Sequence, residues 1–180
     1  MAATKHTIIA VVEDKPGVLN RMASLFRRRG FNIDSIAVGP TDLPHLSRMT
    51  IVLEGAASVV EQVRKQLDKV VDVVKVVDLG GENVVTRELA LIKVKATSAT
   101  RSEIIELVDI FRAGIVDVAA DSVTVEVTGD EEKIGSLLGL LRGFGIKEVA
   151  RTGRVAIARG NSGMVIREEK TGHGPKQVAA

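Results

Sequence analysis

The chain has 180 residues, of which 45% are hydrophobic and 27% charged, and its formal net charge is +2 at pH 7. These values allow two small domains with hydrophobic cores and exclude disorder over the whole chain, and the small net charge provides no strong field toward nucleic acid or an anionic membrane. The absence of cysteine excludes disulfides and thiolate catalysis. Because the apolar runs are too short to cross a membrane and only six residues precede Thr7, we expect a cytoplasmic protein.

The first half of the chain alternates between strand and helix periods. Residues 7–13 form an apolar, β-branched run that predicts a buried strand ending at a turn over 14–17. A helix follows, because Leu19, Met22, Ala23 and Phe26 recur at helical spacing before Gly30. Two strands joined by a proline-containing connection, a second helix and a last strand are predicted at 31–38, 48–53, 59–70 and 72–79. The order βαββαβ is the ferredoxin-like pattern.

The same order repeats after Gly80 and Gly81. Strands are predicted at 87–96, 115–119, 123–127 and 149–158, and helices begin at a capping box formed by Thr100 and Glu103 and at Asp130. Gly135, Gly139 and Gly143 argue against the last helix, since each costs ~1 kcal/mol relative to alanine. We therefore expect an α+β protein with two tandem ferredoxin-like βαββαβ domains at 1–79 and 80–160. Residues 161–180 have no apolar period and are expected to form a flexible tail.

Two short segments of the first half are candidates for binding. Gly17 stands where the first helix exposes unpaired N–H groups, which favour carboxylates and phosphates, although Pro16 is equally typical of an ordinary helix start. Asn32 stands at the start of a strand that is otherwise apolar, and in a β-α-β unit we expect it beside the first strand and near the start of the helix. There it would hold the ammonium or carboxylate of an amino acid while Val18, Leu19 and Ile33 line an apolar pocket. The alternative is that Asn32 caps a turn after Gly30.

These segments resemble an ACT domain. The resemblance lies in Glu-Asp-Lys-Pro-Gly-Val-Leu-Asn-Arg at 13–21, Leu-Phe at 25–26 and Arg-Gly-Phe-Asn-Ile-Asp-Ser at 29–35. Further motifs at 38–42, 46–50 and 65–72 are similar to those of the small regulatory subunit of acetolactate synthase, also called acetohydroxyacid synthase. The resemblance continues through 87–94, 110–112 and 148–153 and covers about the first 160 residues.

The resemblance implies an ACT effector-binding domain at 1–79 and, at 80–160, a domain that contacts and activates the catalytic large subunit. It also implies a homodimer through the ACT domains that binds valine or another branched-chain amino acid, giving feedback inhibition in branched-chain amino acid biosynthesis. Carried over by position, the effector-binding residues are Asp14, Gly17, Val18, Leu19, Asn32 and Ile33. Asp14 stands where some relatives carry asparagine, and its charge would repel a ligand carboxylate unless it faces the ammonium. No cofactor is expected in this chain, whereas thiamine diphosphate, Mg and FAD are expected on the catalytic subunit.

Other functions receive less support from the residues. His6, His45 and His173 are scattered, so we expect no metal site, and the carboxylates at 103, 106 and 109 are typical of a solvated helix face, so we expect no catalytic residue. The three arginines at 27–29 are typical of nucleic-acid binding, but the strands lack the aromatic residues that stack on bases. Arg48 and the loop 40–44 are either a partner contact or a rigid hairpin turn. The alternative function is a stand-alone ACT amino-acid sensor or transcriptional co-regulator without an enzyme partner.

Overall fold

The computed structural model describes residues 5–80 and 83–160, and the predicted tail lies outside these ranges. The first half contains the six predicted elements in order: β1 (Lys5–Glu13), α1 (Val18–Arg29), β2 (Ile33–Pro40), β3 (Leu46–Glu54), α2 (Ala57–Leu67) and β4 (Val73–Asp78). The strands form an antiparallel sheet in the order β2-β3-β1-β4. This arrangement confirms the ferredoxin-like fold of the first half.

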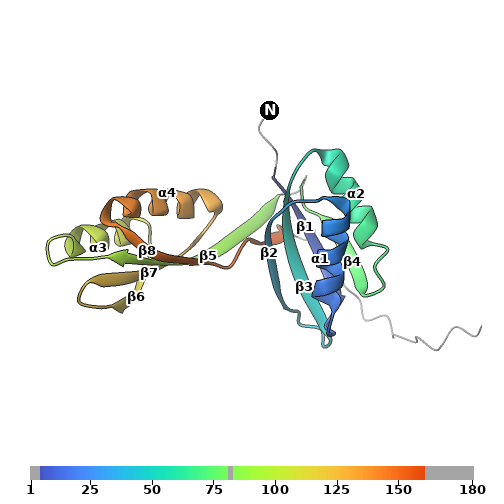
Figure 1. Ribbon diagram of the computed structural model, residues 1–180, viewed down its shortest axis with the longest axis horizontal. Helices are drawn as coiled ribbons and strands as arrows, with labels where there is room; N and C mark the ends of the chain where they lie inside the picture. The colour runs from blue at the N-terminus through green and yellow to red at the C-terminus, as the bar shows by residue number, and fades with distance from the viewer. Residues whose placement is uncertain (1–4, 81–82, 161–180) are drawn as a thin grey trace, which may run out of the picture.

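Both helices of the first half cover the same face of this sheet (Figure 1). The apolar stripe predicted for α1 supplies Met22 and Phe26 to a core whose sheet side includes Ile8 and Ile51, all at most 2% exposed. Gly30 ends the helix as expected, because its φ of 68° is left-handed and its N–H bonds back to carbonyls of the last turn. Burial of this stripe fixes α1 against the sheet.

The second half repeats the pattern around its own core. Its elements are β5 (Val84–Lys95), α3 (Arg101–Ile110), β6 (Gly114–Val118), β7 (Ser122–Gly129), α4 (Glu131–Leu141), β8 (Ile146–Arg151) and β9 (Val155–Ala158), with a short 3-10 helix at Arg142–Phe144. The main sheet has the order β6-β7-β5-β8, and α3 and α4 cover one face of it (Figure 1). The fold is therefore α+β with two ferredoxin-like units.

The helices of the second half differ from expectation in two details. Helix α4 forms despite its glycines, because Ile134, Leu137 and Leu141 are fully buried and the Asp130 side chain accepts a hydrogen bond from the Lys133 N–H at 2.8 Å. The predicted capping box of α3 is wrong. The helix begins at Arg101, but the Thr100 hydroxyl oxygen accepts from the Thr97 N–H and makes no cap bond.

The single strand predicted at 149–158 is also wrong, because the structure divides it into β8 and β9. Gly153 lies between them with a φ of 79°, a left-handed conformation that turns the chain out of the sheet. Strand β8 pairs with the C-terminal part of β5, whereas β9 pairs with its N-terminal part, as in Val84 opposite Ala158. The break lets β9 reach the first half of the molecule.

The ribbon formed by β9 and the start of β5 packs on the face of the first sheet that lacks helices. Ile9, Leu79 and Ala156 form a third buried cluster there, and Figure 1 shows β5 running from this contact into the second sheet. Arg48 donates from Nη2 to the Ala156 carbonyl oxygen at 2.8 Å, and burial lowers its pKa. Arg48 therefore joins the two halves of this chain. No helix in the described ranges is long and apolar enough to cross a membrane.

Candidate functional site at the start of the first helix

Gly17 caps α1 in a conformation that favours glycine. Its φ is 88°. Among residues 5–80 and 83–160, no side chain caps the first helical turn and no atom lies within 4 Å of a Cβ added at Gly17. A helix start without a cap leaves N–H groups directed at the space in front of it, where a carboxylate is favoured. Gly17 therefore keeps that space open in the single chain.

The charges around this helix start are mostly paired. Lys15 bonds Glu13 at 2.7 Å, which raises the pKa of Lys15, and Arg21 pairs with Asp72. Asp14 is fixed by its backbone N–H, which donates to the His45 carbonyl at 2.8 Å, while its exposed side chain makes no ion pair among residues 5–80 and 83–160. The Asp14 carboxylate is thus a negative group available beside the positive end of a helix.

Two of the predicted apolar residues point in different directions. Val18 is 6% exposed and packs into the first core, and its N–H donates to the Lys15 carbonyl oxygen at 3.4 Å, so its side chain is not available at the helix start. Leu19, the next residue, is 54% exposed. A ligand in front of α1 would therefore meet the side chain of Leu19 but not that of Val18.

Asn32 and Ile33 do not lie near this helix start within one chain, contrary to the expectation from the β-α-β pattern. Ile33 is opposite Leu53, and Leu53 is opposite His6 near the beginning of β1, whereas Asp14 follows the end of β1. The 12 residues of α1 separate the two groups by ~18 Å. The reason is geometric, since a helix that returns along the sheet delivers the next strand to the end where the first one began.

The edge of the first sheet carries a feature that the sequence analysis missed. Strand β2 pairs with β3 on one side only, and its helix-facing residues Ile36 and Val38 are 40% and 45% exposed. We call Leu19, Ile36 and Val38, the exposed large apolar residues of α1 and β2, the apolar edge strip. The sequence of β2 did not reveal this exposure, because it depends on the position of the strand at an open edge of the sheet.

Other kinds of site find no support in the described ranges. They contain no group of three or more His, Asp or Glu side chains able to hold a metal ion. The four phenylalanines all belong to the cores: Phe26 is buried, and Phe31, Phe111 and Phe144 pack against the two main clusters. Among the described residues, Glu103 forms no ion pair and belongs to no cluster of His, Asp or Glu side chains that could hold a metal ion.

Both halves match families of known proteins. A family model described as "AHAS small subunit-like ACT domain" matches residues 8–75, and one described as "Small subunit of acetolactate synthase" matches residues 87–160. A probable acetolactate synthase small subunit of Archaeoglobus fulgidus is 59% identical over 157 residues, covering 87% of this chain and 98% of the relative. The acetolactate synthase small subunit of Mycobacterium bovis is 50% identical over 164 residues, covering 91% and 98%.

A solved structure agrees with these sequence matches. The crystal structure of the acetolactate synthase small subunit from Thermotoga maritima superposes with a TM-score of 0.82 at 44% identity, covering 88% of this chain and 99% of that one. The similarity therefore includes both ferredoxin-like units and the order in which they are joined. With two family models covering most of the chain and relatives matched over nearly their full length, the chain belongs to the acetolactate synthase small-subunit family.

Proposed function

We propose that this chain is a regulatory subunit that binds the catalytic large subunit of acetolactate synthase, raises its activity and makes it sensitive to valine. The observation that carries the proposal is the match over both halves to small subunits of this enzyme. The chain itself contributes no catalytic group and no cofactor. Thiamine diphosphate, Mg and FAD belong to the catalytic subunit, and the protein acts in the cytoplasm.

The two halves have different roles. Residues 1–79 form the effector-binding ACT domain, and residues 80–160 bind and activate the catalytic subunit. The division is supported by the separate hydrophobic cores of the two halves and by the separate family models that match them. An activating subunit needs a surface that binds its enzyme in addition to an effector site. We assign that surface to the second unit.

A homodimer completes the effector site. The proposed binding groups lie at opposite ends of α1 in one chain, so a second copy has to supply one of them. Antiparallel pairing of two β2 edges about a two-fold axis brings the Ile33 end of one strand toward the Pro40 end of the other, beside that copy's helix start. The same pairing covers the exposed apolar edge strip. The β2 edge of each copy then lies in the middle of one sheet that is continuous across the dimer.

Each proposed contact then has a distinct role. The N–H groups that follow Gly17 bind the carboxylate of the amino acid, and Asp14 faces its ammonium, which resolves the expected repulsion. Leu19 beside the helix start of one copy and Ile33 of the second copy contact the aliphatic side chain, whereas the side chain of Val18 stays buried in the core. Asn32 of the second copy donates and accepts hydrogen bonds at the polar end. The site selects a small zwitterion with an apolar side chain.

Valine regulates only if it binds two arrangements of the complex with different affinities. A coupling of ~1–3 kcal/mol, or about 5- to 150-fold, is typical of such regulation. Because the effector lies between two copies, its binding changes how the two ACT domains are held together. The catalytic subunit responds through the second unit of each chain.

The test measures acetolactate formation by the purified catalytic subunit, with and without this protein, across a valine titration. Gly17→Asp places bulk and negative charge where the carboxylate binds, and is expected to abolish inhibition while stimulation persists. Asn20→Asp adds the same charge to the first turn of α1 without filling the space before it, and serves as the matched control. Inhibition that survives in a folded Gly17→Asp variant removes Gly17 from the site.

The wild-type protein distinguishes the remaining alternatives. Stimulation without any response to valine keeps the enzyme partner and rejects valine as the effector. A folded wild-type chain that gives no stimulation at any subunit ratio rejects the regulatory-subunit proposal in favour of a stand-alone ACT sensor or co-regulator.

A further inference from the structure

A polar cavity of about 380 Å³ lies between the two halves of the chain, away from the start of α1. The first half contributes Asp34, Ser35 and Ile36 of β2 to its lining. The second half contributes Glu88 of β5, Glu131 of α4 and residues 151–154 of the β8–β9 connection. The cavity is therefore bordered by the strand that follows Asn32 and by the start of α4 and the β8–β9 connection of the second unit.

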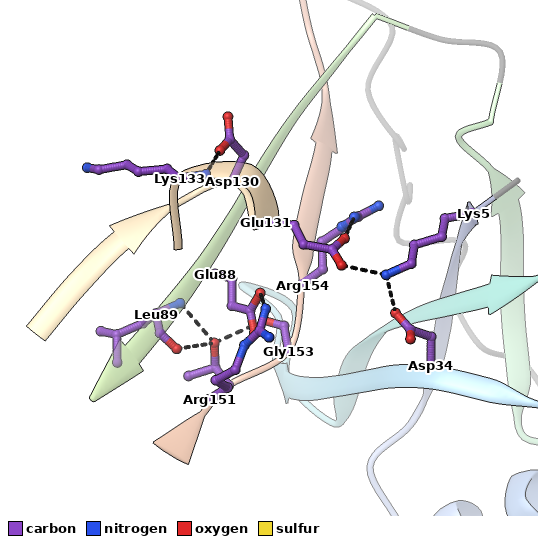
Figure 2. Close-up of polar contacts among 11 residues, drawn as sticks. Lys5, Asp34, Glu88, Leu89, Asp130, Glu131, Lys133, Arg151, Gly153 and Arg154 are labelled. Atoms are coloured by element: carbon purple, nitrogen blue, oxygen red, sulfur yellow. Dashed lines mark hydrogen bonds and ion pairs between the residues drawn. The ribbon is translucent and has the colours of Figure 1, made fainter. Parts of the chain in front are cut away.

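Four charged side chains join the two halves at this cavity. Lys5 Nζ lies 3.1 Å from Asp34 Oδ2 and 2.5 Å from Glu131 Oε1, and Arg154 Nη2 lies 2.8 Å from Glu131 Oε2. Figure 2 shows Lys5 between the two carboxylates and Arg154 on the far side of Glu131. We name Lys5, Asp34, Glu131 and Arg154 the interdomain clasp. It links β1 and β2 of the effector domain to the first residue of α4.

The β8–β9 connection is attached to both halves. Thr152 is tied to β5 in the second unit, because its N–H donates to the Leu89 carbonyl at 3.1 Å and its hydroxyl oxygen accepts from the Leu89 N–H at 3.1 Å. On the other side, a Cβ added to Gly153 would lie 3.3 Å from Ser35 Cβ, so the connection approaches β2 closely. A shift of β2 at Ser35 therefore presses on a segment anchored in the second unit.

The charges of the clasp are matched within the protein rather than left for a ligand. Glu131 receives one cation from each half, and its hydrogen bond with Lys5 lowers the pKa of Glu131 and raises that of Lys5. Glu88, also on the cavity wall, forms a bidentate ion pair with Arg151. Arg151 donates from Nε to Glu88 Oε1 at 2.7 Å and from Nη2 to Glu88 Oε2 at 2.6 Å. Partly exposed ion pairs of this kind contribute little to stability, so the clasp orients the halves and can rearrange.

We propose that the interdomain clasp transmits effector binding from β2 to the second unit. Asp34 is two residues from Asn32, the proposed effector ligand, and its partner Lys5 also holds Glu131. An effector that pulls on the start of β2 changes the Asp34–Lys5 contact and with it the orientation of α4 and the β8–β9 connection. Glu131 and Lys5 are positioning residues in this scheme, since neither touches the effector. The inference rests on the proposed function and names the route of its regulation.

The test separates effector binding from its transmission. Glu131→Gln keeps the size of the side chain and the start of α4 but removes the charge that joins the two halves. Glu132→Gln is the matched control, because Glu132 is the next residue on the same helix, is exposed and forms no ion pair within the described ranges. Valine affinity is measured by calorimetry on the full-length subunit, and stimulation and inhibition are measured in the reconstituted enzyme.

The expected result for Glu131→Gln is unchanged valine affinity and retained stimulation, with the valine concentration for half inhibition raised about 5-fold or more, or with incomplete inhibition. Lys5→Gln is expected to act in the same way, and the double variant to be no worse than either single one, because both substitutions remove the Lys5–Glu131 contact that joins the two halves. Inhibition equal to that of Glu132→Gln overturns the proposal, and so does a loss of valine affinity. A wild-type protein that neither binds valine nor stimulates the enzyme instead refutes the proposed function.

Discussion

Replacement of Ile36 by Asp tests whether the β2 edge forms the homodimer. Ile36 is 40% exposed in the single chain, and full burial of such a side chain contributes ~1.5–3 kcal/mol, so the part still exposed represents about 1 kcal/mol. A two-fold interface contains Ile36 from both copies, so the substitution removes about 2 kcal/mol of binding free energy. This loss raises the dimer dissociation constant about 30-fold. Two aspartates close to the axis also repel each other, so 30-fold is the lower bound of the expected effect.

Sedimentation equilibrium over a dilution series measures this dissociation constant directly. Val71→Asp is the matched control, because Val71 is 84% exposed and precedes β4, the strand at the opposite edge of the sheet. Circular dichroism of both variants checks that the fold is retained. We expect monomers to accumulate with Ile36→Asp at concentrations where the wild type and Val71→Asp remain dimeric. An Ile36→Asp variant that dimerises as tightly as Val71→Asp would refute the proposed β2 interface and the two-chain effector site built on it.

Two further predictions concern stability. Leu137→Ala removes a fully buried side chain of α4 and is expected to cost ~2–5 kcal/mol in urea unfolding, whereas Leu140→Ala, at a position 50% exposed, has a smaller effect; equal losses would contradict the assigned core. Glu61 has its pKa lowered from 4.5 to about 2, chiefly by its hydrogen bond with Arg64, so its pairing stabilises the fold above pH 4.5 and is lost as the pH falls toward 2. Glu61→Gln should flatten the pH dependence of unfolding in that window, and an NMR-measured Glu61 pKa near 4.5 would exclude the effect.

The sequence by itself determined the order of elements and most of the two cores. Apolar residues at strand and helix spacing predicted the βαββαβ order twice, because these periods are local properties that burial then enforces. Local chemistry also predicted the end of α1 at Gly30 and the cap at Asp130. The motifs around Gly17 and Asn32 indicated an ACT domain, and those at 38–42, 46–50 and 65–72 indicated the small-subunit family.

Tertiary structure decided what those motifs do together. The last predicted strand is divided at Gly153, whose backbone is left-handed. The residues after the break form β9, which packs against the first sheet, and the position of that sheet is a property of the tertiary structure. Asn32 stands at the far end of α1 from Gly17, because the direction of a returning helix depends on the sheet it packs against. Lys5 and Glu131 meet across 126 positions of sequence. No local pattern encodes such a contact, because it arises only when two independently formed cores are packed against each other.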